Sequence, residues 1–207
     1  MENYKTILGE GVAEYSEKRS RFIARAIPCD SEEKALEILN KIKSECWDAR
    51  HNVYAYVLRD GSARFSDDGE PHGTAGKPIL DCIMGSGAVD LIVVVTRYFG
   101  GVLLGTGGLV RAYSTSAKDA IDLAPKAMMC VGSEMAVDCA YSELKTLEKL
   151  IAKSGGNITD TVYTDSVRVC FTLKSEDIPA FENELTEAFS GSKRAEIIDT
   201  KYFSFEI

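Results

Sequence analysis

A short apolar run that leads into a glycine-rich turn constrains the fold of this chain most strongly. Residues 91–95 are apolar at every position, which is typical of a strand buried on both faces of a sheet. Five glycines follow between Gly100 and Gly108, ahead of a segment with helical periodicity. Glycine adopts positive φ and lets another backbone or an anion approach closely. The sequence therefore predicts a central strand, a tight turn and a helix start.

The predicted helix start is a candidate anion site, because the first N–H groups of a helix lack intrahelical partners and carry partial positive charge. Arg97 and Arg111 flank the turn, and the Tyr98 ring offers a stacking surface. A guanidinium that ends an apolar strand needs a partner, either a carboxylate such as Asp67 or Asp68 or a ligand phosphate. The candidate anion- or RNA-binding residues are Arg97, Tyr98, Gly100, Gly101, Gly105, Thr106, Gly107, Gly108 and Arg111.

Neither of two common phosphate-binding motifs matches this turn. The turn lacks the lysine of G-x-x-x-x-G-K-[ST], and it lacks the third glycine of G-x-G-x-x-G. Close packing of the strand against the following helix is therefore the structural alternative to a binding role.

A second unusual segment, residues 66–80, begins inside a predicted long loop, residues 59–77, which is rich in Asp and Gly. Its spacing matches no Ca²⁺ loop and no H-E-x-x-H zinc pattern. Three interpretations stay open: a metal or acid–base site, an ordered functional loop without metal, and a purely structural turn. We expect no catalytic residue, metal or cofactor. The loop candidates, with one histidine from a neighbouring strand, are Asp67, Asp68, Glu70, His72, Thr74, Lys77 and His51.

Charge and cysteine content exclude several classes of protein. The net charge is −8, and residues 1–131 hold 16 basic and 18 acidic residues against 8 and 14 in residues 132–207. Any nucleic-acid contact would therefore use a local patch, such as the basic cluster at residues 18–25, which is otherwise a solvated edge. Six cysteines without C-x-x-C, and only two histidines, argue against structural zinc. No run approaches the roughly 20 apolar residues of a membrane helix, so we expect a reduced cytoplasmic protein.

Two domains are expected, at residues 1–131 and 132–207. In the first, Asp30 and Glu33 form a possible capping box before an amphipathic helix. In the second, alternating and helical apolar patterns follow one another in the order βαββαβ, ending in a strand at residues 203–207. This order is the ferredoxin-like pattern of two helices on one face of an antiparallel sheet.

Three motifs carry a resemblance to a known family. They are D-D-G-E-P at residues 67–71, V-V-T-R-Y-F-G-G at residues 94–101 and G-G-L-V-R-A-Y at residues 107–113. Together they closely resemble the YigZ/IMPACT family, over nearly the whole chain. Arg50-His51-Asn52 also fits the family, although Val53 stands where it more often has cysteine.

The resemblance implies an α+β fold. The N-terminal domain would be a ribosomal-protein-like left-handed βαβ domain, and the C-terminal domain would be ferredoxin-like. Eukaryotic members of the family regulate translation, and for bacterial members the resemblance implies a translation-linked or RNA-contacting role without an assigned reaction.

The leading hypothesis is a non-enzymatic cytoplasmic factor with a translation-linked regulatory role, whose partners are RNA, the ribosome or translation proteins. The alternative is an enzyme or sensor that binds a phosphate-containing ligand through the glycine-rich helix start and the acidic loop. A third hypothesis is a protein-interaction module that uses the acidic C-terminal domain. The sequence leaves open whether the acidic loop and the glycine turn meet in space.

Overall fold

The computed structural model describes residues 3–206. Met1, Glu2 and Ile207, which belong to the outer ends of the two expected domains, lie outside the described residues. The fold is mixed α+β, as expected. Apart from the chain ends, it divides into two compact units, Tyr4–Met128 and Met129–Phe205.

The first unit is built on an antiparallel sheet with the strand order β2-β3-β6-β4-β5. Strands β3 and β4 both run antiparallel to β6, which lies between them, and helix α1 connects them. This is a split βαβ arrangement. The strand bounds are β1 (Tyr4–Ile7), β2 (Gly11–Glu17), β3 (Ser20–Pro28), β4 (His51–Val57), β5 (Ala63–Ser66) and β6 (Leu91–Tyr98).

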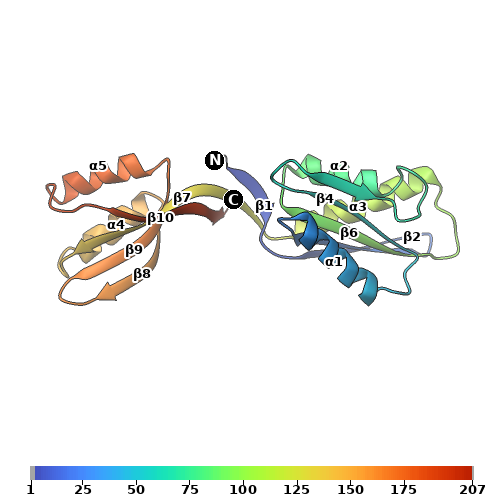
Figure 1. Cartoon of the computed structure of the whole chain (residues 1–207), viewed down its shortest axis with the longest axis horizontal. Helices are drawn as coiled ribbons and strands as arrows, with labels where there is room; N and C mark the ends of the chain where they lie inside the picture. The colour runs from blue at the N-terminus through green and yellow to red at the C-terminus, as the bar shows by residue number, and fades with distance from the viewer. Residues whose placement is uncertain (1–2, 207) are drawn as a thin grey trace. The chain divides into compact units, whose positions relative to one another are not determined.

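Helices cover both faces of this sheet (Figure 1). Helix α1 (Glu32–Glu45) packs on one face, where Ile92 and Val94 of β6 meet its apolar stripe. Helices α2 (Gly76–Ser86) and α3 (Thr106–Leu123) pack on the other, where Val93 and Val95 join a separate core. The prediction that residues 91–95 form a strand buried on both faces is therefore confirmed.

The second unit has the predicted βαββαβ order (Figure 1). Strand β7 pairs with β9 and β10, and β8 pairs with the other side of β9. Apolar residues of the two helices, among them Leu147 and Phe181, pack on the sheet around Phe171. The bounds are β7 (Lys126–Cys139), α4 (Leu144–Lys153), β8 (Asn157–Tyr163), β9 (Val167–Lys174), α5 (Ile178–Ala188) and β10 (Glu196–Glu206).

Two local expectations were wrong. The predicted long loop contains β5, whose backbone pairs with β4. The cap of α1 is Ser31 rather than Asp30, because the Ser31 hydroxyl accepts the Lys34 N–H at 3.3 Å. The Asp30 carboxylate instead accepts from the Lys34 ammonium at 3.4 Å.

Candidate functional site

The acidic loop begins with a carboxylate that holds the loop itself in shape. Asp67 accepts N–H groups from Gly73 at 2.8 Å, Ala75 at 3.1 Å and Gly76 at 2.8 Å. Burial opposes ionisation of this side chain, but the backbone donors outweigh it and lower the pKa of Asp67. Asp67 therefore supplies the cap that Ala75, at the N-terminus of α2, lacks.

The next loop residue ties the loop to strand β4. The Asp68 carboxylate accepts the Asn52 N–H at 2.6 Å and the Lys43 ammonium at 2.9 Å. The Asp68 carbonyl lies 2.7 Å from Nδ1 of His51. Because a carbonyl only accepts, Nδ1 carries the hydrogen of this bond, and the other ring nitrogen, Nε2, faces the interior of the loop.

Glu70 is the carboxylate that pairs with Arg97. Its Oε1 accepts from the guanidinium Nη1 at 2.5 Å and from the Tyr113 hydroxyl at 2.8 Å, and Nε2 of His51 lies 3.8 Å away. The ion pair is deeply buried, with side-chain exposures of 6% for Arg97 and 4% for Glu70. The expectation that Asp67 or Asp68 would be the carboxylate partner is corrected by this geometry.

Tyr113 completes the buried group from helix α3. Burial, followed by the neighbouring carboxylate of Glu70, raises the pKa of Tyr113 far above its usual value. The phenol therefore stays protonated and acts as a fixed donor to Glu70. The Arg97 guanidinium also lies 5.6 Å from the centre of the Phe99 ring.

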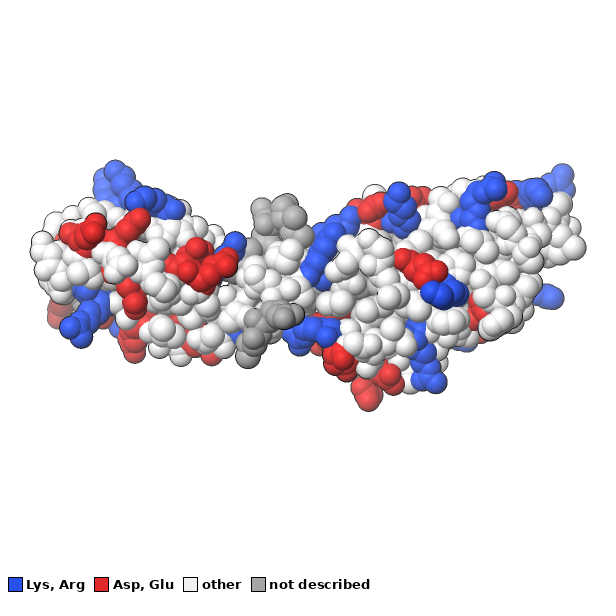
Figure 2. All heavy atoms as spheres, turned by 90° about the horizontal axis from the view of Figure 1, so that it is seen from above, with Lys and Arg blue, Asp and Glu red and all other residues white. Residues whose placement is uncertain are grey.

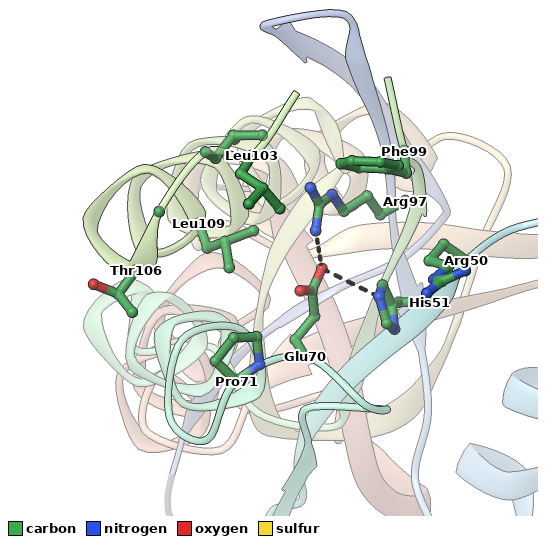
Figure 3. A pocket seen from close by; sticks show the side chains of 11 residues that line it. Arg50, His51, Glu70, Pro71, Arg97, Phe99, Leu103, Thr106 and Leu109 are labelled. Carbon is green, nitrogen blue, oxygen red and sulfur yellow. Dashed lines mark hydrogen bonds and ion pairs between the residues drawn. The ribbon is translucent and has the colours of Figure 1, made fainter. Parts of the chain in front are cut away.

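A pocket of about 450 Å³ opens above this group. Figure 3 shows the side chains of Glu70, Arg97 and His51 on one side and those of Leu109 and Thr106 on the other. The acidic loop and the glycine turn therefore meet in one cavity, which the sequence had left open. Its lining residues are Arg50, His51, Glu70, Pro71, Arg97, Phe99, Leu103, Leu104, Gly105, Thr106 and Leu109.

The start of α3 forms part of the pocket wall. Gly105, at the cap position, has φ of 77°, and no side chain caps the helix. Its carbonyl accepts the Leu109 N–H at 3.0 Å, which is the first helical bond. The N–H groups of the first turn are therefore left to solvent or ligand.

The other end of the turn is packed against the β2–β3 hairpin. A Cβ on Gly100 would lie 2.0 Å from the Arg19 carbonyl carbon, so only glycine fits. The Ser20 hydroxyl accepts the Gly100 N–H at 3.2 Å. The structural interpretation of the turn thus holds at Gly100, whereas Gly107 meets nothing within 4 Å and faces open space.

Several predicted site residues lie away from the pocket lining. Arg111 is exposed on α3, and the Tyr98 hydroxyl donates to Asp48 at 3.3 Å. Burial raises the pKa of Tyr98 to about 12. The His72 side chain is fully exposed, and Lys77 pairs with Asp81 along α2.

The remaining candidates have local structural roles. The Thr74 hydroxyl donates to the Pro71 carbonyl at 2.6 Å. Gly101, with φ of 82°, provides a left-handed position. Gly108 packs on Leu104.

Some residues of this region were not among the predicted site residues. Arg50 lines the pocket, and Tyr113 holds its carboxylate. The sequence did contain a signal for Tyr113. This tyrosine lies on the apolar side of the predicted helix, and a buried phenol needs a hydrogen-bond partner. The only tryptophan, Trp47, is 83% exposed just after α1, which is unusual for so large an apolar side chain.

The pairing of β3, β4 and β6 brings several exposed side chains to one end of the first sheet. Arg21 lies opposite Tyr98, and His51 opposite Arg97, so the start of β3, the start of β4 and the end of β6 coincide. We use the name end surface for five exposed residues in these ends and their adjoining turns. They are Lys18, Arg19, Trp47, Arg50 and Phe99.

The end surface has a local positive character on an acidic protein. Among the described residues, Lys18, Arg19 and Arg50 form no salt bridge, whereas Arg21 pairs with Glu14 at 2.8 Å. The acidic groups Glu45 and Asp48 are also exposed near Trp47, and Glu45 pairs with Arg25 at 2.9 Å. Elsewhere, on the face in Figure 2, basic and acidic side chains are interspersed over both units.

Residues 3–206 contain neither a candidate metal cluster nor a candidate membrane-spanning helix. There, no group of three or more His, Cys, Asp or Glu side chains is placed to hold a metal ion. In the same part of the chain, no helix is both long and apolar enough to cross a membrane. All six cysteines are free thiols.

The fold and pocket define a two-unit α+β protein with a ligand-sized cavity in its N-terminal unit. The family model described as Impact N-terminal domain matches residues 18–121, and that described as Domain of unknown function (DUF1949) matches residues 137–192. The chain belongs to the IMPACT family.

Bacterial relatives match along most of their length. IMPACT family member of Haemophilus influenzae is 38% identical over 84% of this chain and 86% of its own. IMPACT family member YigZ of Escherichia coli is 37% identical over 84% and 88%, and YvyE of Bacillus subtilis 33% over 92% and 89%. A solved structure titled "Crystal structure of an hypothetical protein" aligns with a TM-score of 0.62 at 33% identity, over 96% of this chain and 98% of its own.

A eukaryotic relative matches over a smaller part. Protein IMPACT homolog of Dictyostelium discoideum is 35% identical over 52% of this chain and 32% of its own length. The predicted family and fold class are therefore confirmed.

Proposed function

We propose that this chain is a non-enzymatic, translation-linked regulatory factor that binds single-stranded RNA through the end surface of its first unit. The observation that carries the proposal is the combination of exposed aromatic rings and unpaired cations. Trp47 is 83% and Phe99 47% exposed, beside the cations Lys18, Arg19 and Arg50. The family resemblance supports it, because the eukaryotic relatives regulate translation.

The chemistry of the end surface favours unpaired nucleotides over duplex. Exposed aromatic rings stack on bases that a duplex would keep hidden, and each such contact contributes about 1–3 kcal/mol. Three cations on a chain of net charge −8 give a weak, salt-sensitive electrostatic contribution. Neutralising three phosphates of a single strand gives a slope of about −2 for log K against log salt.

Arg97 does not belong to this RNA-binding surface. Its guanidinium is buried and committed to Glu70, so Arg19 and Arg50 take the part that the sequence suggested for Arg97. Tyr98 is half-buried and is also a weaker stacking candidate than Phe99.

The test uses a charge-removing double variant that fits the backbone. Lys18 and Arg19 have φ of 45° and 67°, the two left-handed positions of a hairpin turn for which Asn-Gly is favoured. Lys18→Asn with Arg19→Gly should therefore fold well. Its affinity for single-stranded RNA should fall, and its salt slope should shrink by about 1.4, the share of two phosphate contacts.

A matched control removes the same charge from the other unit. Lys145→Gln with Lys149→Gln changes two exposed positions on α4 and should leave RNA affinity within twofold. Trp47→Ala should weaken binding without changing the salt slope, because stacking releases no counterions. Absence of RNA binding by the native chain at low salt, or equal losses in the two double variants, would refute the proposal.

A second candidate function is that of an enzyme or sensor for a phosphate-containing ligand. The favouring observation is the pocket, in which a buried carboxylate lies opposite an uncapped helix start. Cavities of about 300–1,000 Å³ with a few converging polar groups are typical small-molecule sites. The pocket shares Arg50 and Phe99 with the end surface, but Trp47 and the hairpin cations Lys18 and Arg19 do not line it. The two candidates are therefore tested with variants at different residues.

A further inference from the structure

We infer that the pocket binds a phosphomonoester that also carries a hydroxyl group. The phosphate would bind the N-terminus of α3, and the hydroxyl would donate to Glu70. The inference rests on the second candidate function and names its ligand class. A sugar phosphate has this chemistry, and so has the 5′-phosphorylated end of an RNA strand.

The phosphate end of the ligand is defined by α3. Thr106, Gly107 and Gly108 present N–H groups at the start of an 18-residue helix whose cap residue, Gly105, offers no side chain. A helix start of this kind binds anions through its N–H groups and its partial positive charge. Gly105 and Thr106 line the pocket, and a Cβ built on the adjacent Gly107 meets no atom within 4 Å, so an anion can approach the backbone at this helix start.

A second, independent observation also points to a ligand. Arg97 lines the pocket and is only 5% exposed, yet its Nε lacks a hydrogen-bond partner among the described residues. A buried donor without a partner costs free energy that a ligand acceptor, or a water held with the ligand, would recover. Arg50 adds an exposed positive charge to the wall of the pocket.

The hydroxyl end of the ligand is defined by Glu70. Its Oε1 already accepts from Arg97 and Tyr113, and Figure 3 shows its other oxygen turned toward the Leu109 side of the pocket. This oxygen, Oε2, accepts no hydrogen bond from residues 3–206. A carboxylate oxygen only accepts, so the ligand group beside it must be a donor.

The charge balance selects a neutral donor. Arg97 lies 2.5 Å from Glu70 and offsets its charge, so the carboxylate neither repels a phosphate strongly nor requires an ammonium group. A hydroxyl satisfies Oε2 without adding charge. Leu104, Leu109 and Phe99 then contact the carbon skeleton between the two polar ends.

The size of the cavity limits the ligand to one sugar or nucleotide. Its volume of about 450 Å³ lies in the range of small-molecule sites and excludes a duplex. A terminal phosphate also suits the site better than an internal phosphodiester, because it carries more charge and leaves one side of the phosphate free of chain. Only the terminal nucleotide of a strand needs to enter.

The experiment compares isosteric variants at Gly107. Ribose 5-phosphate, ribose and inorganic phosphate are titrated into the full chain by calorimetry. Gly107→Asp adds a carboxylate beside the proposed phosphate position, and Gly107→Asn has the same shape without the charge. The Cβ that both variants add meets no atom within 4 Å. Ribose 5-phosphate should bind at least tenfold more weakly to Gly107→Asp than to Gly107→Asn, because only the first adds a negative charge.

The hydroxyl contact is tested with Glu70→Gln. This variant should lose about tenfold in affinity for ribose 5-phosphate and change threefold or less for inorganic phosphate, which lacks the carbon-bound hydroxyl. If ribose 5-phosphate binds the native chain no more tightly than inorganic phosphate, the ligand assignment is overturned, while an anion site survives. If neither phosphate compound binds, the second candidate function fails with it.

RNA hexamers with and without a 5′-phosphate distinguish the two sources of the ligand. Preference for the phosphorylated hexamer, lost in Gly107→Asp, identifies an RNA end and supports the inference. Equal binding of both hexamers, together with tight binding of ribose 5-phosphate, identifies a free sugar phosphate and supports it equally. Lys18→Asn with Arg19→Gly should leave ribose 5-phosphate binding unchanged, because these hairpin cations do not line the pocket.

Discussion

Replacement of Asp67 tests whether one carboxylate organises the acidic loop. Asp67→Ala removes the acceptor of three N–H groups, those of Gly73, Ala75 and Gly76, from a side chain that is 13% exposed. Each partly buried donor left without an acceptor costs about 1 kcal/mol, so the variant should lose about 3 kcal/mol of unfolding free energy at pH 7. Asp67→Asn keeps an oxygen for Ala75 and Gly76 and should lose only about 1–1.5 kcal/mol.

The pH dependence of this effect has a definite sign. The pKa of Asp67 is lower in the folded chain, because backbone donors outweigh the opposing effect of burial. Its ionic stabilisation is therefore fully present above the unfolded-state pKa of about 3.9 and is lost as the pH falls through the folded-state value. The gap between the native chain and Asp67→Ala should be widest at neutral pH and should narrow in acid.

Urea titrations followed by circular dichroism measure this gap. Trp47 fluorescence is a poor probe, because the ring is already 83% exposed in the folded chain. Glu10→Ala, at an exposed position before β2, serves as the control and should change stability by less than about 0.5 kcal/mol. A loss below 1 kcal/mol for Asp67→Ala at pH 7, or a gap that does not narrow in acid, would show that the carboxylate does not organise the loop.

Two further predictions concern the turn and the buried ion pair. Gly100→Ala should destabilise the chain by about 1–3 kcal/mol, because its Cβ would meet the Arg19 backbone at 2.0 Å. Gly107→Ala should instead stabilise it by about 0.5–1 kcal/mol, as measured by thermal unfolding. Equal changes in stability for the two variants would contradict the packing described for the turn. Glu70→Ala should lower the free energy of unfolding by about 3–5 kcal/mol, because it leaves Arg97 charged and buried. Glu70→Met with Arg97→Met should lower it by less than that single change. A double variant at least as unstable as Glu70→Ala would contradict this account.

The local sequence pattern predicted most helices and strands but missed two edge strands of the first sheet. The apolar run of β6, the glycines behind it and the stripes of α4 and α5 are all signals within one segment, and each predicted its element. Strand β2 was missed because its buried positions are the small residues Gly11 and Ala13, whereas the apolar Val12 is exposed. This leaves little apolar contrast along an edge strand. Strand β5 was missed for the same reason, since all but its last residue are exposed.

The site depended on contacts that local pattern does not encode. Asp67, Asp68 and Glu70 look alike in sequence, and only the path of the loop brings Glu70 to Arg97 while Asp67 turns to the α2 backbone. Arg111 looked equivalent to Arg97 at the other end of the turn. It lies two positions beyond the pocket residue Leu109, about 200° around the helix, and therefore points elsewhere.

The burial of β6 on both faces also makes this strand prone to aggregate when the chain unfolds. Leu91 to Val95 carry no charge and no proline, and they are sealed by β3 and β4 at their edges and by helices on both faces. Such a segment pairs readily with copies of itself once its neighbours detach. Heating this protein above its unfolding temperature should therefore cause precipitation rather than reversible unfolding. A lysine introduced at Val93 could not prevent this precipitation, because a charge at that buried position would first destroy the fold.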